Sequence, residues 1–138
     1  MSPSENTGGL NPRGTPMPQT RILMSEDDKR DAAVMYAMLV PWQELATTMP
    51  LQYVMSFLLV AQNEGKGVGD YAEQAGVSSS VMSRHLLDIG ARNRHMEPGW
   101  GLVDYRPNPL ELRKHEYWLT PKGKALFQKM QRTSRGLR

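Results

Sequence analysis

The sequence of 138 residues contains no cysteine, which excludes disulfides, zinc–thiolate sites and thiol nucleophiles. It also lacks any apolar run near the ~18 residues that a membrane-spanning helix requires. The N-terminus does not show the basic-then-apolar pattern of a secretory signal. From these absences we expect a protein of a reducing, cytoplasmic compartment with no membrane partner.

Patterns that indicate an enzyme are missing as well. The three histidines, His85, His95 and His115, are not spaced i, i+4 and form no helical metal pair. No Gly-x-Ser-x-Gly elbow occurs, and residues 65–69 (GKGVG) lack phosphate-loop spacing, so we interpret them as a turn. We expect no catalytic residue, no metal and no cofactor. The pair His95 and Glu97, close in sequence within a loop, is the weak enzymatic alternative.

Charge is distributed unevenly along the chain, although the net charge is only +3. Residues 1–75 hold 5 Lys and Arg against 9 Asp and Glu, a net −4, whereas residues 76–138 hold 12 against 5, a net +7. A basic half of this kind fits a phosphate-binding surface, and an ordinary solvated face is the alternative.

The first 48 residues divide into two segments. Residues 1–24 contain four prolines and three glycines and are predicted to form a disordered arm, in which Arg13 and Arg21 either touch DNA or belong to a plain tail. Residues 25–48 are predicted to be a helix that Ser25 caps and that Pro41 ends or kinks. Because its residues 32–40 are almost continuously apolar, it is either a dimerisation element or ordinary core.

A second helix is predicted after Met49, with Pro50 at its first position and Gly65 at its C-terminal cap. Apolar residues at helical spacing are expected to form its core face: Leu51, Val54, Met55, Leu58 and Leu59.

Residues 69–89 have the organisation of a helix-turn-helix. A short helix over 70–74 leads to Gly76 at the turn, and Ser78 caps a second helix that runs to about Ile89. Met82, Leu86 and Ile89, at i, i+4 and i+7, are predicted to point into the core.

The opposite face of this second helix is polar and carries one cation. Short side chains let a helix enter a major groove, and a long cation reaches guanine O6 and N7. We therefore predict that Arg84 contacts bases. Hydroxyls that bind bases or phosphates are expected at Ser78, Ser79, Ser80 and Ser83. The alternative is a polar cap on an ordinary helix.

Residues 101–106 (GLVDYR) and 115–119 (HEYWL) are predicted to be two strands of a wing. Their connection ends in Arg113 and Lys114, which together with His115 are expected over a minor groove or phosphates, unless the hairpin is merely charged. Thr120 and Pro121 then open a last helix with an apolar stripe, followed by a basic tail over 132–138. The expected fold is mainly α with a small antiparallel β-wing, a winged helix-turn-helix, with residues 49–131 as the DNA-binding domain.

Residues 49–130 resemble the MarR family of bacterial transcriptional regulators. The resemblance is carried by residues 51–59 (LQYVMSFLL), 71–78 (YAEQAGVS), 83–86 (SRHL), 101–103 (GLV) and 119–123 (LTPKG). It implies a cytoplasmic, nucleoid-associated homodimer that binds double-stranded DNA at a roughly palindromic operator, most often as a repressor. It also implies a small aromatic effector, for which Tyr53, Phe57 and Trp42 are candidate lining residues, with core packing as the alternative.

The resemblance assigns DNA contacts to Ser83, Arg84 and Arg113, whereas Asn108 stands where the family has an aspartate. Two departures are visible. The junction over residues 90–101 is long, and its Arg92 and Arg94 are predicted to add phosphate contacts unless the loop is a plain insertion. The chain also ends soon after Met130, so dimerisation would rely on residues 26–46 and the last helix, unless the subunits dimerise weakly or differently. Because winged helices also serve in phage or plasmid nucleoprotein complexes, an architectural or protein-interaction module is the alternative function.

Overall fold

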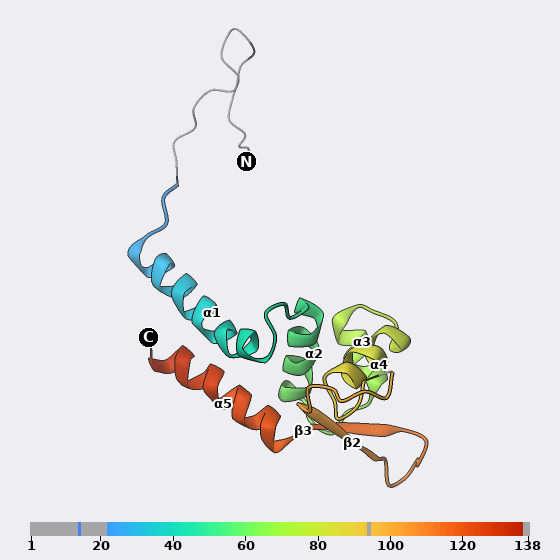
Figure 1. The fold of residues 1–138 in the computed structure, drawn as a ribbon. Coiled ribbons are helices and arrows are strands. Elements are labelled where there is room, and N and C mark those ends of the chain that lie inside the picture. Colours follow the sequence, from blue (N-terminus) through green and yellow to red (C-terminus); the bar gives the residue numbers. More distant parts are fainter. Residues whose placement is uncertain (1–13, 15–21, 94, 137–138) are drawn as a thin grey trace.

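The structure is a computed structural model that describes residues 14, 22–93 and 95–136. Within these residues it contains five helices and one two-stranded antiparallel sheet (Figure 1). The elements are, in order, α1 (Glu26–Leu45), α2 (Leu51–Gln62), α3 (Val68–Ala75), α4 (Ser79–Asp88), β2 (Val103–Pro107), β3 (His115–Leu119) and α5 (Pro121–Gly136). The expected mainly α fold with a small β-wing is confirmed. None of the helices in the described ranges has the length and apolar content to cross a membrane.

Helix α1 begins as its sequence predicts but does not end at Pro41. The Ser25 hydroxyl accepts the Asp28 N–H, and the Asp28 carboxylate accepts the Ser25 N–H, both at 3.0 Å. The helix continues to Leu45 because Pro41 and Trp42 are buried, and Trp42 retains only 2% of its exposure. Burial of this large ring outweighs the one backbone hydrogen bond that a proline removes.

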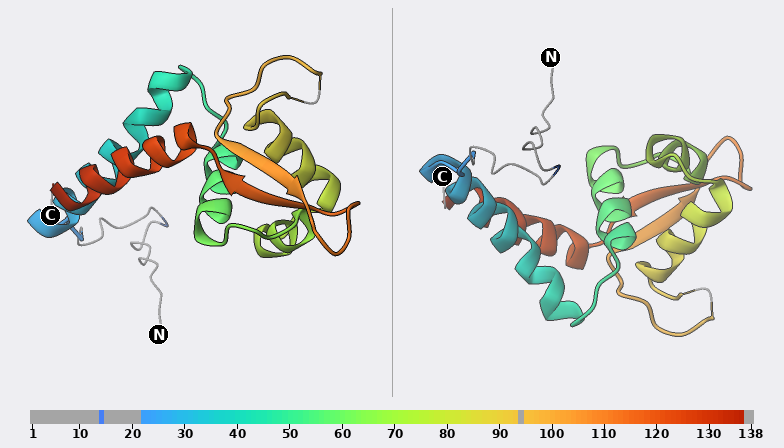
Figure 2. Two further views of the ribbon diagram at one scale, coloured as in Figure 1. Left: turned by 90° about the horizontal axis from the view of Figure 1, so that it is seen from below. Right: turned by 90° about the horizontal axis from the view of Figure 1, so that it is seen from above.

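Helices α1 and α5 form an antiparallel pair that projects from the rest of the molecule (Figures 1 and 2). Val34 of α1 and Leu126 and Met130 of α5 are buried, so the pair has an apolar seam. Helix α5 extends to Gly136, and therefore the basic tail predicted from residue 132 is helical over its first part. Of the predicted arm, only residue 14 and residues 22–24 are described, and 22–24 are exposed outside any helix or strand; Arg13 and Arg21 lie outside the described residues.

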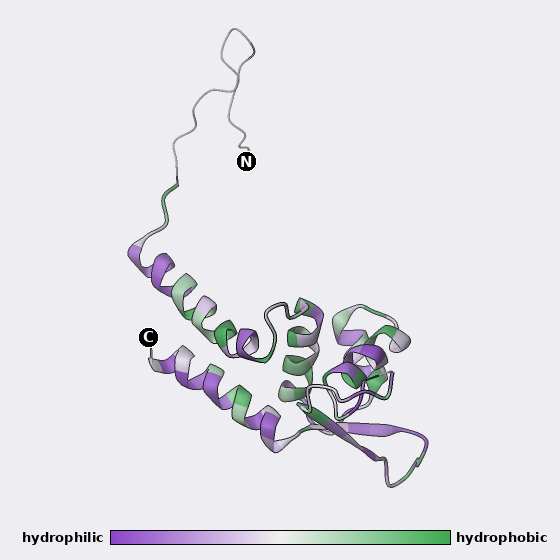
Figure 3. Ribbon diagram, in the orientation of Figure 1, coloured by the Kyte–Doolittle hydropathy of each residue, from purple (hydrophilic) through white to green (hydrophobic). Residues whose placement is uncertain are grey.

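Helix α2 crosses the base of the winged domain, and its inner face is only partly the predicted one: Val54 is buried as predicted, and Leu58 and Leu59 pack half-buried against the core. Val54, Phe57 and Val60 are buried, whereas Leu51 and Met55 are 65% and 57% exposed. Figure 3 shows that this helix is largely hydrophobic, so the sequence pattern alone did not distinguish its inner face. The helix ends at Gln62, and Gly65 lies beyond its cap in the following turn with φ of +87°.

The wing joins the helices through the backbone at its base. The Leu102 N–H donates to the Ile89 carbonyl at 2.7 Å, and the Leu102 carbonyl accepts the Thr120 N–H at 3.0 Å. The Thr120 hydroxyl accepts the Gly123 N–H at 3.0 Å, which confirms the predicted cap of α5, and donates to the Gly101 carbonyl at 2.6 Å.

Gly123 permits the close approach of α5 to Leu102, because a Cβ at this position would overlap the Leu102 carbonyl oxygen. We expect Gly123→Ala to lower the free energy of unfolding by about 1–3 kcal/mol, since backbone atoms cannot move aside as a side chain can. The matched control is Gly69→Ala in the first turn of α3, where nothing lies within 4 Å. There the gain in helix propensity predicts a neutral or slightly stabilising change of up to about 1 kcal/mol. Urea unfolding of both variants measures the difference, and equal midpoints would contradict the steric argument.

Candidate nucleic-acid interface

The turn between α3 and α4 has the geometry that the sequence predicts. Gly76 adopts φ +72° and ψ 31°, in the left-handed region that favours glycine. The Val77 N–H donates to the Ala72 carbonyl at 3.1 Å, and the Gly76 N–H donates to the Glu73 carbonyl at 3.2 Å. These bonds close α3 and fix the angle at which α4 leaves the turn.

Helix α4 starts at a serine cap and exposes further hydroxyls beside it. The Ser78 hydroxyl accepts the Val81 N–H at 3.2 Å and lies 3.1 Å from the hydroxyl of Ser80. Ser78, Ser79 and Ser80 are all exposed, and Ser83 is half-buried one turn later. The first turn of α4 therefore presents small polar groups to solvent.

The two faces of α4 differ as predicted. Met82, Leu86 and Ile89 are each no more than 1% exposed, which anchors the helix in the core. Arg84 is exposed and forms no ion pair within the described residues. A guanidinium that has no partner among the described residues retains its donors there for an external acceptor.

The wing is a hairpin in which Tyr105 pairs with Tyr117 and Pro107 with His115. The rings of Tyr105 and His115 stack with centroids 4.1 Å apart, on the same wing face as Tyr117. Residues 65–66 flank β3, because the Tyr117 N–H donates to the Lys66 carbonyl at 3.0 Å. Figure 3 shows that the two strands are largely hydrophilic toward the tip.

Asn108 organises the wing tip in a way that the sequence did not reveal. Its Oδ1 accepts the N–H groups of Leu110 and Glu111 at 2.7 and 3.1 Å, and its Nδ2 donates to the Glu116 carboxylate at 2.8 Å. The amide thus bonds backbone and carboxylate at once, which an aspartate at this position would not do. The only signal in the sequence is an Asn between two prolines, which marks a turn but not its partner.

A cleft of about 410 Å³ lies between the start of α3, the middle of α4 and the base of the wing tip. It brings together four of the predicted DNA-binding residues, Ser83, Arg113, Lys114 and His115, although they come from segments far apart in the sequence. The remaining predicted residues of α4 lie on its exposed first turns, outside this lining.

The cleft is basic on its wing side and carries one acidic residue in its lining, Asp70. The Asp70 carboxylate accepts the Gly67 N–H at 3.2 Å, so this carboxylate caps the start of α3. The Lys114 Nζ lies 3.2 Å from the Glu111 carboxylate, and both side chains are mostly exposed. An exposed ion pair of this kind contributes little to the stability of the fold, so a phosphate can replace Glu111 as the partner of Lys114 at little cost. Arg113 is exposed and makes no ion pair within the described part of the chain.

Tyr71 fixes the turn that precedes α3 and was not singled out by its sequence. Its hydroxyl donates to the Asn63 carbonyl at 2.5 Å and accepts the Lys66 N–H at 3.3 Å. Burial, opposed by the Lys66 hydrogen bond, raises the pKa of Tyr71 to about 12. The phenol therefore stays protonated at neutral pH and keeps its donor toward Asn63.

Other predicted residues lie elsewhere. Arg92 is not part of the cleft; its guanidinium donates to the Met96 carbonyl at 3.0 Å within the loop 90–101. Arg94 lies outside the described residues.

Trp42 and Phe57 pack edge to face in the core with centroids 5.0 Å apart, which matches core packing and not a ligand pocket. In the described ranges no cluster of three or more His, Asp or Glu side chains forms a metal site.

No protein-family profile matches the sequence, and no curated protein matches it. Solved structures share its fold. Transcriptional regulator Tm0710 from Thermotoga maritima superposes with a TM-score of 0.61 at 17% identity over 78% of this chain and 69% of that one. The MarR-like regulator tm0816 from the same organism gives 0.56 and 20% over 83% and 79%.

The MarR family regulator SP03579 gives a TM-score of 0.54 at 21% identity, over 76% of this chain. The match spans only 60% of that regulator's own length. Likeness at such low identity concerns the arrangement of helices and strands, not the residues of a site. The chain has the winged helix-turn-helix fold of MarR family transcription regulators.

Proposed function

We propose that this protein is a transcriptional regulator that binds double-stranded DNA at a specific sequence. Helix α4 enters the major groove, and the wing lies over the adjacent minor groove or phosphates. The observation that carries the proposal is the placement of Arg84 and the serines on the outer face of α4, beside a cleft that holds Arg113 and Lys114. Base-reading and phosphate-binding groups then occupy neighbouring surfaces, as protein–DNA recognition requires.

Rigidity supports reading of bases. Helix α4 is fixed by its buried stripe, its serine cap and the Gly76 turn, so its outer side chains keep a defined direction. A bidentate contact from Arg84 to a guanine discriminates only if the helix cannot shift relative to the wing. The backbone bonds at Leu102 hold the two elements together.

A homodimer is the second part of the proposal. Met35, Tyr36 and Leu39 lie within one turn of α1 and are 62%, 70% and 46% exposed, although they belong to an apolar segment. Ile22, Leu23 and Met24 just before the helix are exposed as well. Two copies that pack through these helices would bury this strip and present two copies of α4 to the two halves of a palindromic site. A dimer seated on an operator would exclude other proteins, so we propose repression.

Arg84→Ala is expected to weaken binding to a sequence selected from random duplexes by about 1–3 kcal/mol and to relax the preference at one base pair. The reason is the loss of one bidentate contact to a base edge. Repeated selection with the variant measures the preference. Arg30→Ala serves as the control, because Arg30 is an exposed arginine on α1, 3.0 Å from Asp27. An unchanged preference in the Arg84 variant would refute its role.

Arg113→Ala is expected to weaken binding equally for all sequences and to reduce the slope of log affinity against log salt by about one, because one phosphate contact is lost. Titrations of specific and random duplexes at several salt concentrations provide the measurement. Loss of preference with an unchanged slope would instead place Arg113 at a base. Wild-type binding without any preference would favour an architectural protein over a regulator.

Replacing Tyr36 and Leu39 together with Glu is expected to convert a dimer into a monomer, because two charges cannot be buried unpaired at an apolar interface. Light scattering without DNA measures the mass. The control is Leu110→Glu at the wing tip, where the leucine is 94% exposed and lies far from α1 in sequence and structure. A monomeric wild-type chain would overturn this part of the proposal while leaving the DNA-binding surface intact.

A further inference from the structure

The outer face of α5 is a stripe of cations. The helix contains no Asp or Glu, and all of its Lys and Arg side chains are exposed: Lys122, Lys124, Lys129, Arg132 and Arg135. Leu126 and Met130 on the opposite face are buried, where α5 packs on α1. At a rise of 1.5 Å per residue, the cations extend over about 20 Å of the helix. We call this surface the α5 stripe.

Most of these charges lie where they destabilise the isolated helix. Lys122 and Lys124 are in its first turn, at the positive end of the helix dipole, where acidic residues are favourable and cations are not. Lys129 and Arg132 follow at i, i+3 spacing, at which like charges repel. Only Arg135 lies in the last turn, where the dipole favours a cation. The stability of the helix therefore does not account for the stripe.

A helix face that is merely solvated usually mixes charges of both signs, and α1 does so. Its first turn is acidic, as the helix dipole favours, and its next two residues are cations that pair back to that turn. Helix α5 differs because its cations have few partners in the described part of the chain. Lys129 lies 4.0 Å from the Glu44 carboxylate, with both side chains mostly exposed, and the other four cations form no ion pair there.

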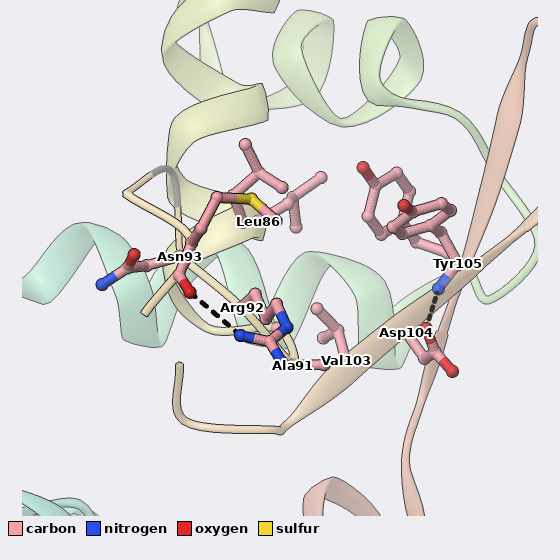
Figure 4. Close-up of a pocket in the computed structure, with 11 residues that line it drawn as sticks. Leu86, Ala91, Arg92, Asn93, Val103, Asp104 and Tyr105 are labelled. Atoms are coloured by element: carbon pink, nitrogen blue, oxygen red, sulfur yellow. Dashed lines mark hydrogen bonds between the residues drawn. The ribbon is translucent and has the colours of Figure 1, made fainter. Parts of the chain in front are cut away.

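The stripe is separate from the surface that we propose for reading bases. Helix α5 leads from the base of the wing away from the wing tip, alongside α1 (Figures 1 and 2). Arg84 lies on α4, and Arg113 and Lys114 lie at the cleft beside the wing tip. Arg92 belongs to neither surface, because its guanidinium donates to the Met96 carbonyl at 3.0 Å within the loop 90–101 (Figure 4).

The proposed dimer would leave the stripe open. Val34 is buried in the seam between α1 and α5, whereas Tyr36 in the exposed apolar strip follows it by two residues. Two residues correspond to about 200° around a helix, so the strip lies on the side of α1 that faces away from α5. A partner copy packed on that strip would not cover the outer face of α5.

A second copy of this chain does not supply the matching negative charge either. The acids in the first turn of α1 already have partners in or beside their own helix: Glu26 with Lys29, Asp27 with Arg30, and Asp28 with Ser25. A polyanion with closely and regularly spaced charges fits the stripe better. Phosphates follow one another at about 3.4 Å along the axis on each DNA strand, so a stripe of about 20 Å lies along about six of them.

We propose that the α5 stripe binds the phosphate backbone of a second DNA duplex, without reading its sequence, while α4 and the wing hold the first. The chain then bridges two duplexes. The contact between the stripe and phosphates stands on the charges of α5 alone. Bridging, in contrast, rests on the proposed function, because it requires the first duplex on α4.

The first experiment isolates the stripe from the base-reading surface. The full chain carrying Arg84→Ala and Arg113→Ala is titrated with a random duplex at several salt concentrations. Adding Lys124→Gln and Arg132→Gln to this chain is expected to reduce the slope of log affinity against log salt by about two, because each phosphate contact contributes about 0.9. Glutamine has nearly the helix propensity of Lys and Arg, so α5 is expected to remain folded, which circular dichroism checks.

The matched control adds Lys29→Gln and Arg30→Gln to the same chain. It also removes one lysine and one arginine, from exposed positions of α1, so the net charge falls equally. We expect this control to leave the salt slope unchanged. Equal slopes in the two sets of variants would show that only net charge matters and would overturn the proposal.

Competition tests the class of partner. Unlabelled random duplex and polyglutamate of the same total charge each compete with the labelled duplex for the chain with Arg84→Ala and Arg113→Ala. We expect the duplex to displace at about tenfold lower concentration, because it carries one charge per about 1.7 Å, whereas an extended peptide carries one per about 3.4 Å. Displacement by polyglutamate at an equal or lower concentration would indicate an acidic protein as the partner and overturn the proposal.

The last experiment tests bridging with the otherwise unaltered chain. The selected duplex is immobilised, loaded with protein and washed with a labelled random duplex. We expect capture by the wild type and by Lys29→Gln/Arg30→Gln, and about tenfold less capture by Lys124→Gln/Arg132→Gln at equal loading.

The absence of capture, together with a loss of affinity in Lys124→Gln/Arg132→Gln only for longer immobilised duplexes, would overturn bridging, because the stripe would then contact flanking DNA of the same duplex. Failure to select any sequence would refute the proposed function instead. The salt titrations would still decide whether the stripe binds phosphates, because they use random duplexes and a chain without Arg84 and Arg113.

Discussion

Leu102 joins the three parts of the molecule. Its side chain is fully buried, its N–H donates to the end of α4 at Ile89, and its carbonyl accepts the N–H of Thr120 where α5 begins. Gly123 packs directly against that same carbonyl. One residue thus links α4, the wing and the projecting helix pair. We expect a change at this point to alter both the proposed DNA-binding surface and the direction of the proposed dimer axis.

This connection has a consequence for DNA reading. Two half-sites of a palindrome are separated by about 34–36 Å, one turn of the duplex, so two copies of α4 must be placed with little freedom. In this chain the placement would pass from the α1–α5 pair through Thr120 and Leu102 to α4. These contacts are short backbone hydrogen bonds and apolar packing, not long side-chain bridges. Such a path would fix the position of α4 relative to the helix pair.

The elements that sequence alone predicted are those whose signals are local. Gly76, Ser78 and the Met82–Leu86–Ile89 spacing identify the helix-turn-helix because cap, turn and stripe all act within a few residues. The passage of α1 through Pro41 was not predicted, because it depends on the burial of Trp42 by distant segments. The inner face of α2 was only partly predicted for a related reason: apolar residues lie all round the helix, and only tertiary packing selects Phe57 over Met55.

The candidate site shows the same division between local and distant information. Ser83 and Arg113 were assigned from the sequence and line one cleft. The hydrogen bond from the Asn108 amide to the Glu116 carboxylate could not be predicted, because it depends on the register of the two strands. Charge was the least informative signal. Residues 76–138 carry 12 Lys and Arg, but five of them, Lys122, Lys124, Lys129, Arg132 and Arg135, lie on α5, and Arg92 lies in the loop 90–101 with its guanidinium on the Met96 carbonyl.

Among the described residues, the surface formed by α4 and the wing therefore holds few cations: Arg84 on the helix, Arg106 on β2, and Arg113 and Lys114 at the cleft. Each phosphate contact contributes a slope of only about 0.9 to the salt dependence, so non-specific attraction by this surface of one copy would be weak. Tight binding would then have to come from base contacts by α4, repeated on the second half-site by a partner copy. The sparse charge of the interface thus argues for a symmetric, sequence-reading dimer over a protein that coats DNA by charge alone.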